Sequence, residues 1–220
     1  MSARPGPTST HGQPTPPPNG HTARARRRAV ATIAGLALLV LIAVGVVELP
    51  GGSHSGDASV RLTRAQTSAL LAGSPAALAA LHAQAGEVLN GGASALHARL
   101  AALKGYPVVI NKWASWCVPC REERGAFQRA AAEYGRRVAF LGIDSGDAGR
   151  ADARSFLRSF PMSYPSYYDH SGELGEQITD SSFTPVTVFL ARDGHRFIYQ
   201  GQFPSVAKLE QDIRRYALNA

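Results

Sequence analysis

Two cysteines three positions apart are the residues of this sequence with the clearest capacity for chemistry. Cys117 and Cys120 are the only cysteines among 220 residues, and they lie in the segment Trp113-Ala114-Ser115-Trp116-Cys117-Val118-Pro119-Cys120. The β-branched run 108–110 before them predicts a strand, and the residues after them follow the period of a helix. Cys117 would then stand in the first helical turn, where unpaired backbone N–H groups and the helix dipole favour a thiolate.

Thiol–disulfide exchange is the chemistry that such a pair suits best. Cys117 would act as the accessible nucleophile, and Cys120, one helical turn further on, as the resolving thiol that closes a disulfide. A zinc site would need two more ligands, yet the sequence has no other Cys and no zinc-spaced pair among its seven His residues. A purely structural disulfide across so small a loop would contribute little stability. We therefore expect redox chemistry, no bound metal and no cofactor beyond the redox-active disulfide.

The net charge of +7 would suggest a nucleic-acid binder if it were spread over the chain. However, five of the 23 Lys and Arg residues precede Glu48, and no Asp or Glu does. The rest of the chain carries 18 basic and 16 acidic residues, a net charge of +2. Because the excess belongs to the N-terminal part, we expect a nearly neutral folded domain that does not bind nucleic acid.

The N-terminal part predicts a single-pass membrane anchor. Residues 1–28 are rich in Pro, Gly, Ser and Thr and end in a cluster of arginines, which predicts a disordered tail. Residues 29–47 are an uncharged run that as a helix spans about 28 Å, close to the ~30 Å bilayer core. The arginines before the run place the tail in the cytoplasm and the later residues outside. A cleavable signal peptide is the main alternative, but the run is long for one and no A-x-A site follows it.

Two segments separate this anchor from the main domain. Residues 48–61 contain Pro, Gly, Ser and His and predict a flexible linker. Residues 62–104 are rich in Ala and Leu, with glycine breaks, and Leu96, Leu100 and Leu103 fall on one helical face. We predict a helical extension over 62–104 that packs on the main domain.

Residues 105–220 alternate between strand and helix patterns, which predicts an α/β fold with a mixed central sheet flanked by helices. Strands are expected at 108–111, 137–143, 186–190 and 197–200. Helices are expected at 122–134, 151–160 and 171–178, with a last one that begins after Ser205. Arg192-Asp193-Gly194 predicts the turn that joins the last two strands into an antiparallel hairpin.

This element order, with W-x2-W-C-x2-C after the first strand and Thr184-Pro185 before the hairpin, resembles the thioredoxin superfamily. More closely, residues 111–123 are similar to the TlpA/ResA-type branch of membrane-anchored, extracytoplasmic thiol–disulfide oxidoreductases. The resemblance covers about residues 105–218 and is most specific at 111–123 and 183–190, whereas the family's N-terminal β-hairpin is not recognisable before residue 104. It implies a thioredoxin-like fold, disulfide-containing substrate proteins and a transmembrane electron donor.

The resemblance also implies roles for residues around the dithiol. Pro185 would be a cis proline facing the dithiol, and Thr184 would present backbone groups to an extended substrate chain. Trp113 and Trp116 would shield the sulfurs and shape the docking surface, and the alternative for Trp113 is a place mainly in the core. The substrate-binding residues expected in this way are Trp113, Trp116, Val118, Pro119, Thr184 and Pro185.

Glu123 matches an acidic position near the dithiol in this branch. We expect Glu123 to relay a proton to Cys120, and the alternative is a solvated helix residue. Thioredoxin itself has a buried aspartate where this chain has Asn111, so that relay is absent here. Gly125 replaces a helix-kinking proline, which leaves no basis for predicting a kink.

The residues between the cysteines indicate the direction of electron flow. Strong oxidants stabilise the thiolate of the reduced form, often through a His at this place, whereas Val118 and Pro119 supply neither charge nor a side-chain donor. Only the N-terminus of the helix and Arg121 would stabilise the thiolate. We therefore predict an extracytoplasmic reductant of substrate protein disulfides, and the resemblance implies an apocytochrome c haem-site disulfide as one substrate.

Three alternatives use the same residues differently. A protein-thiol oxidase would run the exchange in the opposite direction. A peroxiredoxin-like peroxidase would need Pro-x3-Thr-x2-Cys, and Ala114 stands where that Thr would fall. A non-enzymatic Cu(I)-binding dithiol domain would need Met or His near the thiolates, and Met162 has no obvious partner.

Overall fold

The computed structural model of the chain describes residues 62–219. The chain divides into two units, residues 1–54 and 55–220, and the described residues all belong to the second. The tail, the membrane anchor and the linker expected over residues 1–61 lie outside the described residues. Between residues 62 and 219, no helix is long and apolar enough to cross a membrane.

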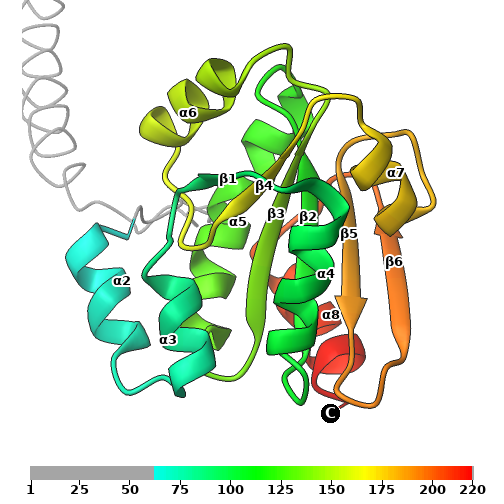
Figure 1. Cartoon of the computed structure of the whole chain (residues 1–220). Helices are drawn as coiled ribbons and strands as arrows, with labels where there is room; N and C mark the ends of the chain where they lie inside the picture. Colours follow the sequence, from blue (N-terminus) through cyan, green and yellow to red (C-terminus); the bar gives the residue numbers. More distant parts are fainter. Residues whose placement is uncertain (1–61, 220) are drawn as a thin grey trace, which may run out of the picture. The chain divides into compact units, whose positions relative to one another are not determined.

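Helices and strands alternate along most of the described chain (Figure 1). The helices are α2 (Arg64–Leu71), α3 (Ala76–His82), α4 (Gly92–Ala102), α5 (Val118–Tyr134), α6 (Arg150–Ser159), α7 (Glu173–Thr179) and α8 (Val206–Asp212), with one π-helical turn, η1 (Ile213–Ala217), directly after α8. The strands are β1 (Val88–Leu89), β2 (Val108–Trp113), β3 (Ala139–Ser145), β4 (Ser166–Asp169), β5 (Val186–Leu190) and β6 (Arg196–Gln200). The expected thioredoxin-like α/β fold with a mixed sheet is confirmed.

The six strands form one sheet in the order β1-β4-β3-β2-β5-β6. Strands β1 to β4 run parallel to one another, while β5 is antiparallel to both β2 and β6. Val186, the first residue of β5, lies opposite Lys112 near the end of β2. Three segments therefore meet at one end of the sheet. They are the segments that follow β2 and β3 and the segment that precedes β5.

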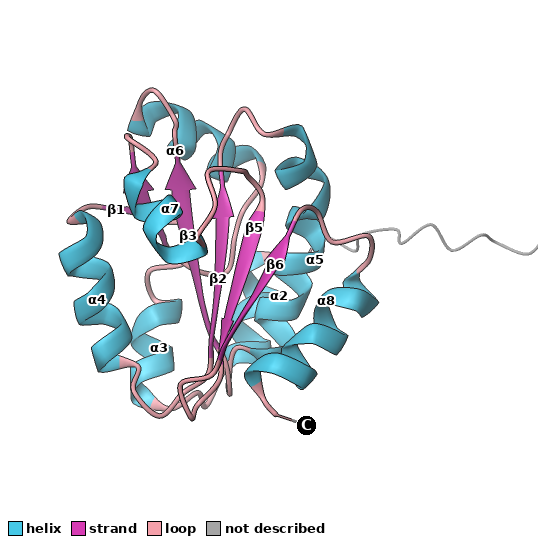
Figure 2. Cartoon of the chain, turned by 90° about the vertical axis from the view of Figure 1, so that its right-hand side faces the viewer, coloured by secondary structure: helices cyan, strands magenta, loops and turns pink. Residues whose placement is uncertain are grey.

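Helices cover both faces of the sheet, as Figure 2 shows edge-on. Because side chains alternate along a strand, Val109 of β2 joins one hydrophobic cluster while Val108 and Ile110 join the other. The first cluster contains side chains of α5, α6 and α8. The second contains side chains of α3, α4 and α7. The central strands are thus buried on both sides, which gives a rigid base to the end of the sheet where these segments meet.

Two strands, β1 and β4, are absent from the sequence prediction. β1 has two residues and β4 has four, so neither is long enough to show a period of two. Both are strands because Val88 pairs with Ser166, and Ser166 pairs in turn with Gly142 of β3. The expected helical extension over 62–104 therefore holds three helices and also an edge strand of the main sheet.

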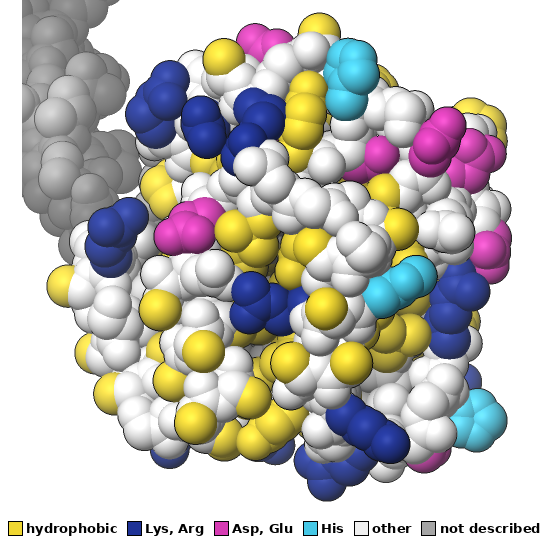
Figure 3. All heavy atoms as spheres, viewed as in Figure 1, with side chains coloured by type: hydrophobic (Ala, Val, Ile, Leu, Met, Phe, Trp, Pro, Cys, Tyr) yellow, Lys and Arg dark blue, Asp and Glu magenta, His cyan; other side chains and the backbone are white. Residues whose placement is uncertain are grey.

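Charged side chains of the two signs gather in different places on the face shown in Figure 3. Lys and Arg side chains lie over α6, which carries Arg150, Arg154 and Arg158. Acidic side chains lie over α7, which carries Glu173 and Glu176. This face therefore presents charge of both signs.

Candidate active site

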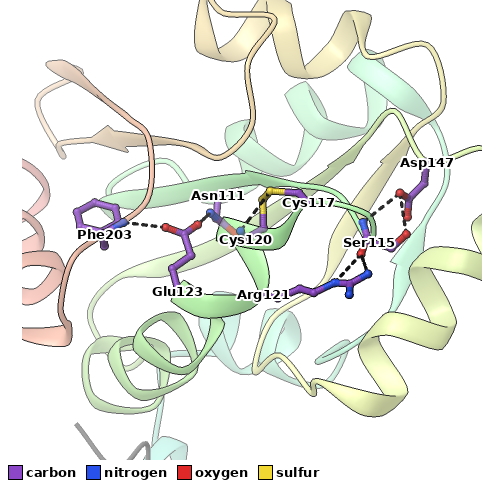
Figure 4. The surroundings of a disulfide bond; sticks show 8 residues. All are labelled: Asn111, Ser115, Cys117, Cys120, Arg121, Glu123, Asp147 and Phe203. Carbon is purple, nitrogen blue, oxygen red and sulfur yellow. Dashed lines mark hydrogen bonds between the residues drawn. A yellow bond between two sulfur atoms is a disulfide. The ribbon is translucent and has the colours of Figure 1, made fainter. Parts of the chain in front are cut away.

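The two cysteines lie at the N-terminus of α5, in the turn that follows β2 (Figure 4). Cys117 is the N-cap residue, and it forms a disulfide with Cys120 with an S–S distance of 2.03 Å. The backbone N–H of Cys120 donates a hydrogen bond to Cys117 Sγ at 3.2 Å. Pro119 fits this turn because residues there need no backbone N–H partner. A thiolate formed at Cys117 on reduction would face this N–H and the positive end of the helix dipole.

Both cysteines are covered in this oxidised form. Cys117 is 3% exposed and Cys120 is 2% exposed, and both belong to the hydrophobic cluster under α5. The expectation that Cys117 is accessible is therefore wrong for the disulfide form, because it considered only the turn and not the side chains packed around it. The neighbouring side chains therefore cover both sulfurs.

Three exposed apolar side chains lie at the edge of the sheet that carries the disulfide. Trp116 is 59% exposed and Val118 is 60% exposed, and they directly precede and follow Cys117. Phe183 is 76% exposed and lies in the segment that leads into β5, whose first residue is opposite the end of β2. We call Trp116, Val118 and Phe183 the rim. Such exposed apolar groups are typical of surfaces that bind other proteins.

Hydrogen bonds with Lys112 and Gly201 hold the segment before β5 in place. The Thr184–Pro185 peptide bond is cis, as the resemblance implies. Lys112, which is 2% exposed, donates from Nζ to the carbonyl of Ser181 at 2.7 Å. The Pro185 carbonyl accepts the N–H of Gly201 at 3.0 Å. Pro185 is buried and Thr184 is half-buried, and their role in substrate binding stays a prediction.

Trp113 does not belong to the substrate surface. It is 1% exposed, its ring stacks on Phe156 with centroids 4.8 Å apart, and its Nε1 donates to Ser166 Oγ at 3.0 Å. A side chain buried on all sides cannot touch a substrate. The expectation that Trp113 binds substrate is therefore wrong, because the W-x2-W spacing does not tell which of the two rings points inward. Trp116 is the exposed member of the pair.

Glu123 is a buried carboxyl one helical turn after Cys120. It is 3% exposed, and its two oxygens accept hydrogen bonds from Asn111 Nδ2 at 3.1 Å and from the backbone N–H of Phe203 at 3.0 Å (Figure 4). Burial raises the pKa of Glu123 to about 7, against the two hydrogen bonds, which favour the charged form. Residues three apart on a helix are neighbours, so Glu123 lies on the Cys120 side of α5. The alternative of a solvated helix residue is excluded.

The segment before Cys117 is tied down by side chains on both sides (Figure 4). Asp147 Oδ1 accepts the backbone N–H of Ser115 at 3.0 Å and the Ser115 hydroxyl at 2.9 Å. Arg121 donates from Nε and Nη2 to the Ser115 carbonyl at 2.9 and 2.5 Å. The Trp116 indole donates to the Gly146 carbonyl at 3.1 Å. The guanidinium of Arg121 therefore fixes the backbone of the turn.

Four residues of this site were not assigned a role from the sequence. Asn111 and Phe203 hold the Glu123 carboxyl, Asp147 holds Ser115, and Phe183 extends the rim. Asn111 carried a usable signal, because a polar residue inside a buried strand needs a partner. Phe203 carried none, since it contributes a backbone N–H from 80 residues away.

A family model matches this chain, and the curated proteins that are similar to it include a thioredoxin-like protein, a thiol-disulfide oxidoreductase and a thiol:disulfide interchange protein. Residues 84–194 match the model of the AhpC/TSA family. The thioredoxin-like protein YneN of Bacillus subtilis is 31% identical over 71 residues, 31% of this chain and 42% of that protein. The thiol-disulfide oxidoreductase ResA of Oceanobacillus iheyensis is 28% identical over 96 residues, 44% of this chain and 50% of that protein. The thiol:disulfide interchange protein DsbE of Allochromatium vinosum is 36% identical over 74 residues, 33% of this chain and 39% of that protein. The chain thus spans half the length of these relatives or less.

Proposed function

Because this chain belongs to the AhpC/TSA family, we propose that it is a thiol–disulfide oxidoreductase that works through Cys117 and Cys120. The observation that carries the proposal is a disulfide at a helix N-terminus with a buried acid, Glu123, one turn behind it. Relatives named as a thiol-disulfide oxidoreductase and an interchange protein support the same class of reaction.

In the first step, the reduced chain attacks a disulfide of a substrate protein. The thiolate of Cys117 attacks one substrate sulfur, a bond forms between the two sulfurs, and the other substrate sulfur leaves as a thiolate. The N–H of Cys120 and the helix dipole favour the attacking thiolate. The rim of Trp116, Val118 and Phe183 offers the apolar surface on which the substrate chain rests.

In the second step, Cys120 resolves the mixed disulfide. Cys120 must lose its proton before it attacks Cys117 Sγ, and in this proposal the Glu123 carboxylate, on the Cys120 side of α5, takes that proton. The Cys117–Cys120 disulfide forms, and the second substrate sulfur leaves as a thiolate. Two electrons have then passed from the chain to the substrate. A group whose pKa is about 7 suits this task, since it holds and releases a proton near neutral pH.

We further propose that the chain acts as a reductant. Val118 and Pro119 bring neither charge nor a side-chain donor between the cysteines, and Arg121 donates to the Ser115 carbonyl. The extra thiolate stabilisation that makes a strong oxidant is therefore small. A reductant outside the cytoplasm needs a supply of electrons, so the proposal includes a transmembrane electron donor.

Peroxide reduction is a known alternative use of a cysteine in such folds. A peroxidatic cysteine of that type would have Thr three residues before it, and this chain has Ala114 there. The disulfide partner, Cys120, lies within one helical turn of Cys117, where it can resolve a mixed disulfide. These two observations favour exchange.

The location and the substrate are proposed from the sequence. The apolar run 29–47 supports an uncleaved anchor, with the tail in the cytoplasm and residues 48–220 outside. The likeness to the TlpA/ResA-type branch supports haem-site disulfides of apocytochrome c as one substrate class.

The test of the proposal is the reduction potential of the whole detergent-solubilised chain, equilibrated with dithiothreitol or glutathione buffers. Cys117→Ala and Cys120→Ala are the controls, and neither should show a couple. A potential near or below about −270 mV, that of thioredoxin, supports a reductant. A potential near about −120 mV would make the chain an oxidant. Absence of any two-electron couple would refute the enzyme proposal.

A further inference from the structure

Asp144, near the end of β3, is a buried carboxyl for which the proposed reaction has no use. It is 0% exposed and lies in the sheet between Trp113 of β2 and Tyr168 of β4. Within residues 62–219, neither of its oxygens has a hydrogen-bond donor. An ionised carboxylate in such a place is strongly disfavoured, because nothing replaces the water that it has lost.

Asp147, three residues later, has the complementary arrangement. Its Oδ1 accepts two hydrogen bonds from Ser115, while its Oδ2 is buried and has no donor among the described residues. Asp147 raises the pKa of Asp144 both by its charge and as a hydrogen-bond partner. A protonated carboxyl has one O–H to donate. One proton placed between Asp144 and Asp147 therefore partners an oxygen of each.

We propose that Asp144 and Asp147 share one proton and that this pair positions the segment 114–117, which ends at the first cysteine of the dithiol. Asp144 is the acid and Asp147 the carboxylate, since only Asp147 has other donors to hold a negative charge. Through Asp147 the pair fixes Ser115, whose carbonyl binds Arg121 of α5. Both are positioning residues, because they act on Cys117 through Ser115.

The groups around Asp144 also favour its protonated form. Asp169 of β4 and Asp152 of α6 both disfavour a charge on Asp144, and burial together with Asp147 raises its pKa to about 9. Tyr168 of β4 is neutral near pH 7, and Arg150 of α6 lies 5.9 Å from the ring of Tyr168. Asp169 has its own donors in the N–H groups of Leu174 and Gly175 and the Ser145 hydroxyl. The proton therefore stays on Asp144 at neutral pH.

Loss of this proton should release the segment. Two adjacent carboxylates without an intervening proton repel each other, so Asp147 can no longer keep its place against Ser115. The inference does not need the redox proposal, because it concerns a proton and a backbone amide. Only its effect on Cys117 rests on the proposed function.

The test is amide hydrogen exchange at Ser115 in the whole oxidised chain between pH 6 and pH 10.5, corrected for the intrinsic exchange rate. Wild-type protection should fall by roughly tenfold per pH unit above the Asp144 pKa, because opening is linked to loss of one proton. Asp144→Asn should stay protected throughout, since its amide still donates to Asp147 and cannot ionise. Asp144→Leu should lose protection at every pH. Asp152→Asn, a change of an exposed acid with the smallest of the named effects on Asp144, should keep the fall in protection and move its onset only slightly to lower pH.

Three results would overturn the inference: a flat wild-type profile, equal protection in Asp144→Asn and Asp144→Leu, or protection that disappears on addition of EDTA. The last would show that a cation and not a proton lies between the carboxyls. If Asp144→Leu fails to fold, the contrast between wild type and Asp144→Asn decides alone. The same samples give the reduction potential, so a chain without a two-electron couple but with the Ser115 profile would refute the redox proposal and keep this one.

Discussion

Replacing Glu123 by Gln should remove a specific part of the pH dependence of stability. The pKa of Glu123 is about 7 in the folded chain and 4.5 without the fold, so between these values the folded state holds more of the proton. Stability therefore falls as pH rises from 4.5 to 7. A difference of about 2.5 units corresponds to about 3 kcal/mol, at about 1.4 kcal/mol per unit.

The side-chain amide of the Glu123→Gln variant cannot titrate, so the variant should lack this fall. The amide oxygen can keep only one of the two donors, Asn111 Nδ2 and the Phe203 N–H, and this adds a loss of about 1–2 kcal/mol that does not depend on pH. The quantity to measure is therefore the change with pH of the difference in free energy of unfolding between variant and wild type. It should move by about 3 kcal/mol in favour of Glu123→Gln between pH 4 and pH 8.

Urea unfolding of the oxidised chain, followed by tryptophan fluorescence, measures this difference. Glu122→Gln is a matched control, since Glu122 is exposed on the same helix and should give a constant difference. Parallel profiles for Glu123→Gln and wild type would refute the reasoning, because Glu123 would then titrate alike in the folded and unfolded chain. The placement of Glu123 as an acid near neutral pH would fall with it.

Four further substitutions test the burial of the two tryptophans, the rim and the hydrogen bond from Asn111 to Glu123. Trp113→Ala should cost about 3–5 kcal/mol in urea unfolding, whereas Trp116→Ala should cost about 0.5 kcal/mol or less, because only the first ring is buried. Phe183→Ser should leave the unfolding midpoint unchanged and raise the KM for a protein disulfide severalfold. The rate at which dithiothreitol reduces the Cys117–Cys120 disulfide should stay the same. An equal change in both reactions would contradict a docking role for Phe183. Asn111→Ala should raise the pKa of Glu123 further by removing a hydrogen bond to the charged form, and an NMR titration of the Glu123 carboxyl that shows no rise would contradict this.

The parts of the fold with strong local patterns are predicted well from the sequence. The strand 186–190 has the predicted bounds, and the helix predicted from 122 begins earlier, at Val118, because Cys117 acts as its cap. β1 and β4 are missed because they are short and exist only through pairing with each other and with β3. Local propensity cannot show such strands.

The residues of the site also fall into those that the local sequence predicts and those that it does not. Cys117, Cys120 and the cis bond before Pro185 follow from two motifs, each of which spans only a few residues. What the motif cannot show is burial, so it errs on the exposure of Cys117 and on Trp113. The partners of Glu123 come from β2 and from the segment after β6, and only the folded chain brings them together.

The hydrogen bond from the Phe203 N–H to Glu123 also sets an order of events during synthesis. Glu123 leaves the ribosome 80 residues ahead of the backbone group that completes its surroundings, and the two cysteines leave before Glu123. Until this backbone group has reached α5, the Glu123 carboxyl lacks one of the two hydrogen-bond donors that hold it. A nascent chain therefore carries its two cysteines for some time before the surroundings of Glu123, the proposed proton acceptor, are complete. Maturation of this redox site is then a property of the C-terminal third of the chain, far from the motif by which the site is recognised.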